Sequence, residues 1–189
     1  MVLSADSIRM DELARHRLIK PETPTDLVGN RLVLIARKGA EPVVIVPGFP
    51  LARLVGAGPL AMCDPDSHPA GRYAKASLVK LGIWRNVERK VASVDDPLVA
   101  VKNVARGDAP MAVVFATDAL TDPAVAIVGT FPSDTHPRIV YPVALLAQSR
   151  NPEAVKFFDY LKSPAARSVF RKLGYVTPTL QLDRPVKRR

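Results

Sequence analysis

The residue types that could do chemistry gather in one short stretch, between Cys63 and Leu78, which reads CDPDSHPAGRYAKASL. It holds a thiol, two carboxylates, an imidazole and a guanidinium. The apolar run before it, Pro59–Met62, predicts a buried strand. After Pro69 the apolar residues recur at helical spacing, which predicts an amphipathic helix. Proline suits the first turn of a helix, because its missing N–H would have no intrahelical partner there.

A strand, a polar loop and a helix that starts with small residues form, in this order, a place where an anion can bind. Ala70 and Gly71 leave nearly bare backbone amides at the positive end of the helix. We therefore expect these two residues to contribute donors to an anion. The alternative is a helix start that binds nothing, since many helices that follow a strand begin with proline or small residues.

Two other kinds of chemistry fit the composition less well. Cys63, His68 and an aspartate such as Asp64 or Asp66 are the right types for nucleophilic catalysis. Cys63 ends an apolar run, however, which favours a small buried hydrophobe, and we expect no enzyme. The net charge of +9 would suit a nucleic acid, but the basic residues are scattered and only 184–189 form a compact basic run. Without a stacking or zinc-finger signature, we expect a solvated basic surface and no nucleic-acid partner.

Strands and helices alternate along the chain, which indicates the α/β class. The expected strands after the amino terminus are Leu32–Ala36, Val43–Val46, Met111–Phe115 and Val125–Val128. Helices are expected from Asp6, near Leu51–Val55, and after Asp96, Asn151 and Ser163, with inward stripes that include Ile8, Val155, Val169 and Leu173. Pro142 interrupts the apolar run 139–147 and argues for a sheet edge or a crossing between lobes.

Length and composition set further bounds. The chain has 189 residues, of which 48% are hydrophobic, so a sizeable core is possible. No apolar run is long enough to span a membrane, and residues 1–6 show no signal peptide. A single cysteine excludes an internal disulfide. The last dozen residues are expected to be disordered.

The motif from Asp64 to Ala74, D-P-x-x-x-P-A-G-x-Y-A, resembles the hallmark of periplasmic molybdate-binding proteins of ABC transporters. The resemblance covers roughly residues 2–175. Further segments that resemble this family, in the same order, are Ser4–Asp6, Met10–Asp11, Leu27–Leu34, Val114–Ala119, Phe131–Pro132, Tyr141–Val143 and Phe157–Leu161.

The resemblance implies a two-lobed periplasmic binding protein of type II, with one lobe complete and one partial. Residues 1–36 and 143–189 would form the partial lobe, and residues 37–142 the complete one. The implied function is the solute-binding component of molybdate import, with an ABC transporter permease as partner and a periplasmic location. The ligand would be molybdate or tungstate, held as an oxyanion by a monomer that has no cofactor and no metal site.

The resemblance also suggests which residues face the oxyanion. The Ala70 amide matches the family's donor, and Gly71 follows it. The family's next donor is an amide at the following helix start, where Pro97 stands and has no N–H, so the ligand would use Leu98 or lose that bond. The family's tyrosine aligns with Phe115, which keeps the ring and lacks the hydroxyl. His68 stands where the family usually has an apolar residue, and could either add a donor or simply be solvated.

Family members carry further structure before the position of Met1, with serines that supply half of the donors. We therefore expect a misplaced start, a fragment or a decayed gene, and an isolated chain that is poorly soluble because its partial lobe exposes apolar stripes. A hydrogen bond to a charged group is worth roughly 1.5–3 kcal/mol, so losing two donors would weaken binding by about two to four decades. The sequence thus predicts a shortened oxyanion-binding protein with weakened binding. The alternative is a degenerate scaffold or fragment of that family which binds nothing.

Overall fold

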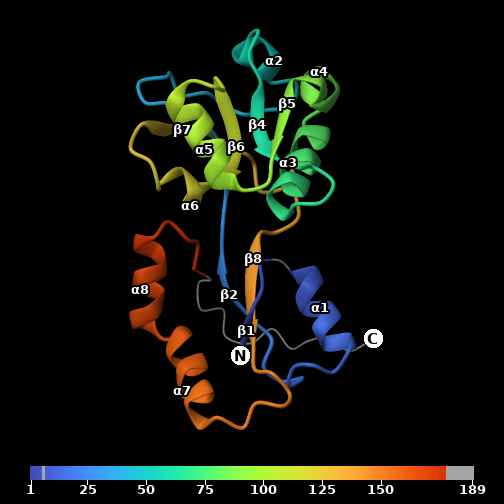
Figure 1. Cartoon of the computed structure of the whole chain (residues 1–189), viewed down its shortest axis with the longest axis vertical. Helices are drawn as coiled ribbons and strands as arrows, with labels where there is room; N and C mark the ends of the chain where they lie inside the picture. Colours follow the sequence, from blue (N-terminus) through green and yellow to red (C-terminus); the bar gives the residue numbers. More distant parts are fainter. Residues whose placement is uncertain (6, 178–189) are drawn as a thin grey trace. The chain divides into compact units, whose positions relative to one another are not determined.

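The chain folds into two compact units, Met1–Gly29 with Val140–Arg189 (unit 1) and Asn30–Ile139 (unit 2). Figure 1 shows the elements of both in a computed structural model, which describes residues 1–5 and 7–177. The resemblance implies a division after residues 36 and 142 instead. The contacts divide it after 29 and 139, because the strand at 32–37 pairs on both sides within unit 2. The expected cap at Asp6 and the expected disorder of the last dozen residues concern positions outside the described residues.

Unit 2 is built on a five-stranded sheet with the order β5-β4-β6-β3-β7. Its strands are β3 (Leu32–Arg37), β4 (Leu60–Cys63), β5 (Val91–Val94), β6 (Met111–Phe115) and β7 (Val125–Thr130). Its helices are α2 (Leu51–Val55), α3 (Pro69–Lys80), α4 (Trp84–Val87), α5 (Pro97–Arg106) and α6 (Ala116–Ala119), with a 3-10 turn at Glu88–Lys90. β4, β5 and β6 run parallel, whereas β3 is antiparallel to both of its neighbours, β6 and β7.

The core of unit 2 lies where the sequence predicts continuous apolar strands. β4 and β6 are buried along their whole length, and only Arg37 of β3 is exposed. Strands buried on both faces read as unbroken apolar runs, which explains why they were predictable. The predicted strand Val43–Val46 is wrong: this segment is irregular, and Val44 is 79% exposed. Pro42 and Pro47 flank it, and proline has no N–H for a sheet ladder.

Unit 1 contains a smaller antiparallel sheet with the order β1-β8-β2. Its elements are β1 (Val2–Leu3), α1 (Ser7–Arg15), β2 (Thr25–Gly29), β8 (Val140–Ala144), α7 (Pro152–Leu161) and α8 (Pro164–Lys172). Pro142 does not lie on an edge strand, because β8 is the central strand. It is tolerated there because the pairing with β2 shifts register between Asp26 and Val28 beside it, and its carbonyl still accepts from Ser4 N–H.

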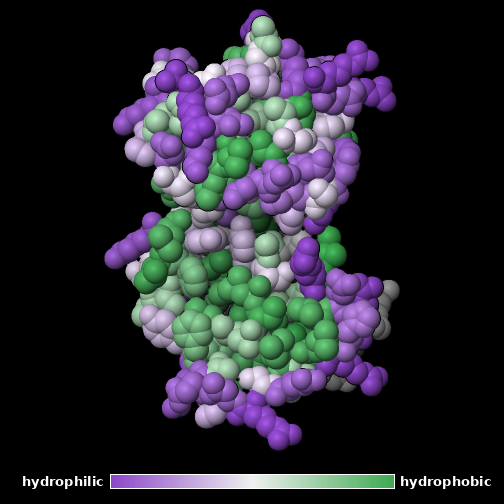
Figure 2. Space-filling view, in the orientation of Figure 1, coloured by the Kyte–Doolittle hydropathy of each residue, from purple (hydrophilic) through white to green (hydrophobic). Residues whose placement is uncertain are grey.

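Several apolar side chains of unit 1 that the sequence places inward are exposed. Phe158 and Leu161 of α7 are buried, whereas Val155 of α7, Val169 of α8 and Leu173 just after α8 are 42%, 51% and 56% exposed. Ile8 of α1, also expected inward, is exposed as well. Figure 2 shows the resulting hydrophobic area over α7, α8 and the neighbouring sheet. These helices thus expose apolar surface to solvent. Within the described residues, no helix has the length and apolar character needed to cross a membrane.

Candidate functional site

Three helices of unit 2 begin at one edge of its sheet. The parallel strands β4, β5 and β6 end at Cys63, Val94 and Phe115, and Cys63 pairs with Val94 in register. Each strand is followed by a helix, α3, α5 and α6 respectively. The carboxyl ends of parallel strands lie at the same edge, so these helix starts gather there. Ligands of open α/β sheets bind outside this edge.

The loop before α3 is fixed by its own side chains. The Asp64 carboxylate accepts hydrogen bonds from Ser67 Oγ (2.7 Å), Ser67 N–H (2.8 Å) and Asp66 N–H (3.0 Å). These bonds, the Ser67 hydroxyl first, lower the pKa of Asp64. The loop therefore presents the start of α3 in one defined conformation.

Gly71 is buried for a packing reason. A Cβ at this position would lie 2.5 Å from the carbonyl oxygen of Cys63 and closer still to that of Asp64. The first turn of α3 thus packs directly on the end of β4, and only glycine allows this approach. Position 71 therefore requires glycine because of close backbone packing, whether or not a ligand binds.

The backbone N–H groups at this edge already donate hydrogen bonds to side chains of the protein. The Ala70 N–H, in a residue that is 1% exposed, donates to Nδ1 of His68 at 3.1 Å. The Leu98 N–H donates to Asp96 Oδ1 at 2.8 Å, next to Pro97 at the first position of α5. The Phe115 N–H donates to Asp118 Oδ2 at 3.2 Å. Helix ends need such partners when no ligand supplies them. An oxyanion at these amides would have to displace the caps.

Phe115 offers this edge an aromatic ring and no hydroxyl. The ring is buried and lies edge-on to Tyr73 of α3, with the centroids 6.1 Å apart. The structure therefore places Ala70, Gly71, Pro97, Leu98 and Phe115, the residues that the sequence proposes, at the starts of the helices and at the end of β6.

The sequence did not indicate the polar residues whose hydrogen bonds fix the start of α6. Asn30, which is buried, donates from Nδ2 to Thr117 Oγ1 at 2.9 Å and accepts from Arg31 N–H. Asp118 completes the arrangement through its bond to Phe115. The signal that could have indicated Asp118 is an acidic residue in the first turn of a predicted helix.

The electrostatics at this edge oppose an anion. Burial first, and then the nearby charge of Asp96, raise the pKa of Asp118 to about 6, against the lowering effect of the Phe115 N–H. Burial, together with Asp118, Asp96 and Asp95, raises the pKa of Cys63 to about 12. Cys63 is thus a buried thiol without thiolate character at neutral pH, which argues against a nucleophile here. Among the described residues no group of three or more His, Cys, Asp or Glu side chains could hold a metal ion.

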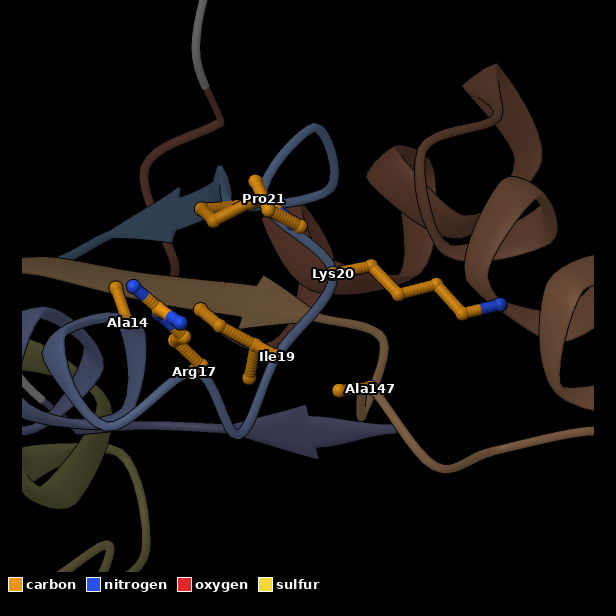
Figure 3. Close-up of a pocket in the computed structure, with 7 residues that line it drawn as sticks. Ala14, Arg17, Ile19, Lys20, Pro21 and Ala147 are labelled. Carbon is orange, nitrogen blue, oxygen red and sulfur yellow. The ribbon is translucent and has the colours of Figure 1, made fainter.

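A pocket in unit 1 is of a different kind. Its volume is about 510 Å³, and its lining is mainly aliphatic, with the two cationic residues Arg17 and Lys20. In Figure 3 the Lys20 amino group points away from the cluster of Ala14, Arg17 and Ile19. The pocket therefore does not offer a converging set of donors, in contrast to the helix starts of unit 2.

Helix starts gathered at the carboxyl edge of a sheet are the place where α/β proteins bind their ligands. The family model described as "Bacterial extracellular solute-binding protein" matches residues 1–176, and the chain belongs to this family. It is 36% identical to the molybdate-binding protein ModA of Escherichia coli over 93% of its own length and 69% of that protein. It is also 36% identical to ModA of Haemophilus influenzae, over 92% and 68% of the two lengths.

Solved structures agree on the fold. The periplasmic molybdate-binding protein of Azotobacter vinelandii superposes with a TM-score of 0.74 at 21% identity, covering 94% of this chain and 78% of that one. The expected fold, the type II periplasmic binding fold, is thereby confirmed. The chain spans about two thirds of the length of the two ModA relatives.

Proposed function

We propose that this protein is the solute-binding component of an ABC importer for molybdate. The observation that carries the proposal is the 36% identity to the molybdate-binding protein of Escherichia coli over 93% of the chain. The position of the Asp64–Ala74 motif at the start of α3 supports it, because backbone amides at a helix start suit a compact dianion. Tungstate, with similar size and charge, is included in the ligand class. A transporter permease is the partner, and the protein works as a monomer outside the cytoplasmic membrane.

The mechanism needs only neutral donors and no covalent step. Ala70 and Gly71 on α3, and Leu98 on α5, would supply N–H groups to the oxyanion. Pro97 has no N–H and Phe115 has no hydroxyl. Compared with the family's donors at these two positions, the oxyanion therefore loses two hydrogen bonds worth roughly 1.5–3 kcal/mol each. Asp96 and Asp118 add negative charge at the same edge. We therefore propose weak binding, and a scaffold that binds no oxyanion is the second candidate because these departures favour it.

Calorimetric titration of the full chain with sodium molybdate separates the two candidates, with sulfate at equal ionic strength as the competing anion. Saturable binding of molybdate with little heat from sulfate supports the importer component. An absence of molybdate binding at millimolar concentrations contradicts it and favours the scaffold.

A pair of matched variants tests where the anion binds. Asp96→Asn keeps an acceptor for the Leu98 N–H while it removes one negative charge, so molybdate affinity should rise several-fold. Asp122 is a suitable control because its Oδ1 also accepts from a backbone N–H two residues later, that of Ala124 at 2.9 Å. It lies at the opposite edge of the sheet, beside the start of β7 and the end of β3 at Arg37. Asp122→Asn should leave the affinity unchanged, and an equal gain in both variants would place the anion elsewhere.

A further inference from the structure

The His68 side chain accepts a hydrogen bond from the Ala70 N–H, the donor that the oxyanion would need. Its backbone is extended, it is the N-cap of α3, and its Nδ1 accepts the Ala70 N–H at 3.1 Å. A nitrogen that accepts a hydrogen bond carries no proton, so the ring is neutral in this arrangement. The oxyanion and the neutral imidazole therefore compete for the same donor.

The groups around the ring keep it neutral in the absence of ligand. Arg72, one turn into α3, faces it with a positive charge, whereas Asp64 of the preceding loop and Asp96 of the α5 start face it with negative charges. Burial first, and then Arg72, lower the pKa of His68 below its ordinary value, against the opposing effect of the two aspartates. At neutral pH the cap on Ala70 is thus intact.

We propose that His68 couples oxyanion binding to the uptake of one proton. A protonated imidazole cannot accept from Ala70, because both ring nitrogens then carry hydrogen. The amide is released, and the imidazolium offers the anion a charged donor at the helix start. This inference rests on the proposed oxyanion function and adds to it the regulation of the same site by pH.

The direction of the pH effect follows from the charges. A bound dianion stabilises the imidazolium, so His68 has a higher pKa in the complex than in the free protein. Between these two values, binding takes up one proton, and affinity rises by at most about tenfold for each unit by which the pH falls. Above the higher value the ring stays neutral and the affinity is low and constant.

Isothermal titration of the full chain with sodium molybdate tests the coupling. Titrations between about pH 6 and about pH 8, each in two buffers of different ionisation enthalpy, give the number of protons taken up. We expect uptake that approaches one proton per anion within this range, with an affinity that increases as the pH falls. Binding without proton uptake overturns the role of His68 and leaves the proposed function standing, whereas no binding at any pH overturns both.

Two variants assign the proton. His68→Asn retains an acceptor at the N-cap and does not titrate, so binding should be weak and independent of pH. His68→Ala frees the Ala70 amide, so at about pH 8 it should bind more tightly than the wild type, again without proton uptake. His16→Ala, in unit 1, is the control and should retain the uptake. Proton uptake that persists in both His68 variants belongs to another group, such as Asp118, and overturns the inference.

Discussion

Replacing Asp118 with asparagine should stabilise unit 2 at neutral pH and leave it nearly unchanged in acid. Burial raises the pKa of this carboxyl from its ordinary 3.8 to about 6 in the folded protein. One pKa unit corresponds to about 1.4 kcal/mol, so ionised Asp118 lowers the free energy of unfolding by about 3 kcal/mol. The stability associated with its neutral form is fully present below pH 3.8 and is lost as the pH rises through about 6. Asparagine never ionises, and its side-chain oxygen can still accept the Phe115 N–H.

Urea unfolding of the full chain, followed by the fluorescence of Trp84, measures this effect. Trp84 is the only tryptophan and belongs to α4 of unit 2, so its signal reports on that unit. The difference in unfolding free energy between variant and wild type should grow from near zero at about pH 4 to about 3 kcal/mol at about pH 7.5. Asp122→Asn, at the opposite sheet edge, should show no such growth. A difference for Asp118→Asn that is the same at both pH values would refute the argument from burial.

Four other outcomes follow from the same structure. Gly71→Ala should destabilise unit 2 by more than about 2 kcal/mol in the same fluorescence assay, because the new methyl group would overlap backbone carbonyls at the end of β4. Phe115→Tyr should tighten molybdate binding by about ten- to a hundredfold in calorimetry if the added hydroxyl reaches the anion, since one charge-assisted bond is worth roughly 1.5–3 kcal/mol. Cys63, which is 1% exposed, should resist a thiol reagent in native protein and react fully in urea. Light scattering should show self-association that Phe157→Lys and Leu173→Lys reduce, since both wild-type side chains are more than half exposed.

The helix starts were predictable because their signals act within one turn. Proline at the first position and a polar cap before it restrict the backbone locally, whatever the rest of the fold does. α3 begins at Pro69, α5 at Pro97 and α8 at Pro164, as the sequence predicts. Gly107, whose residue type suits a helix end, caps α5 in the left-handed conformation.

The errors arise where tertiary pairing decides the outcome. Val43–Val46 has the apolar character of a strand, yet the Val43 N–H bonds a single carbonyl, that of Val128, and no ladder forms. Pro142 predicts either a sheet edge or a crossing between lobes; the edge is wrong, because a register shift in the neighbouring strand allows it to be central, whereas the chain does pass from unit 2 to unit 1 just before it, between Ile139 and Val140. Neither outcome is encoded within a short window of sequence, because each depends on a partner strand far along the chain.

The sequence predicts that the candidate residues lie at helix starts, but it does not predict which groups their amides bond. The sequence predicts a helix start after Asp96, where aspartate suits the cap, and it also suggests the Leu98 amide as a donor to a ligand. The structure shows that these two roles conflict, since the cap uses that amide. The His68 bond to Ala70 depends on a side-chain rotamer, which no spacing rule gives.

The two caps differ in what an incoming dianion must do to replace them. An imidazole can take up a proton and change from acceptor to donor. The Ala70 N–H at the start of α3 is then released, and the imidazolium attracts the oxyanion. An ionised carboxylate has only acceptors, so at the start of α5 an oxyanion would exchange one anionic acceptor for another at the Leu98 N–H and would still face the displaced charge. The net gain at α5 is therefore small, and most of the binding free energy must come from α3. For this reason substitutions at the α3 cap should abolish the pH dependence of oxyanion affinity, whereas Asp96→Asn should raise the affinity and retain a pH dependence, shifted to lower pH because the charge of Asp96 no longer raises the pKa of His68.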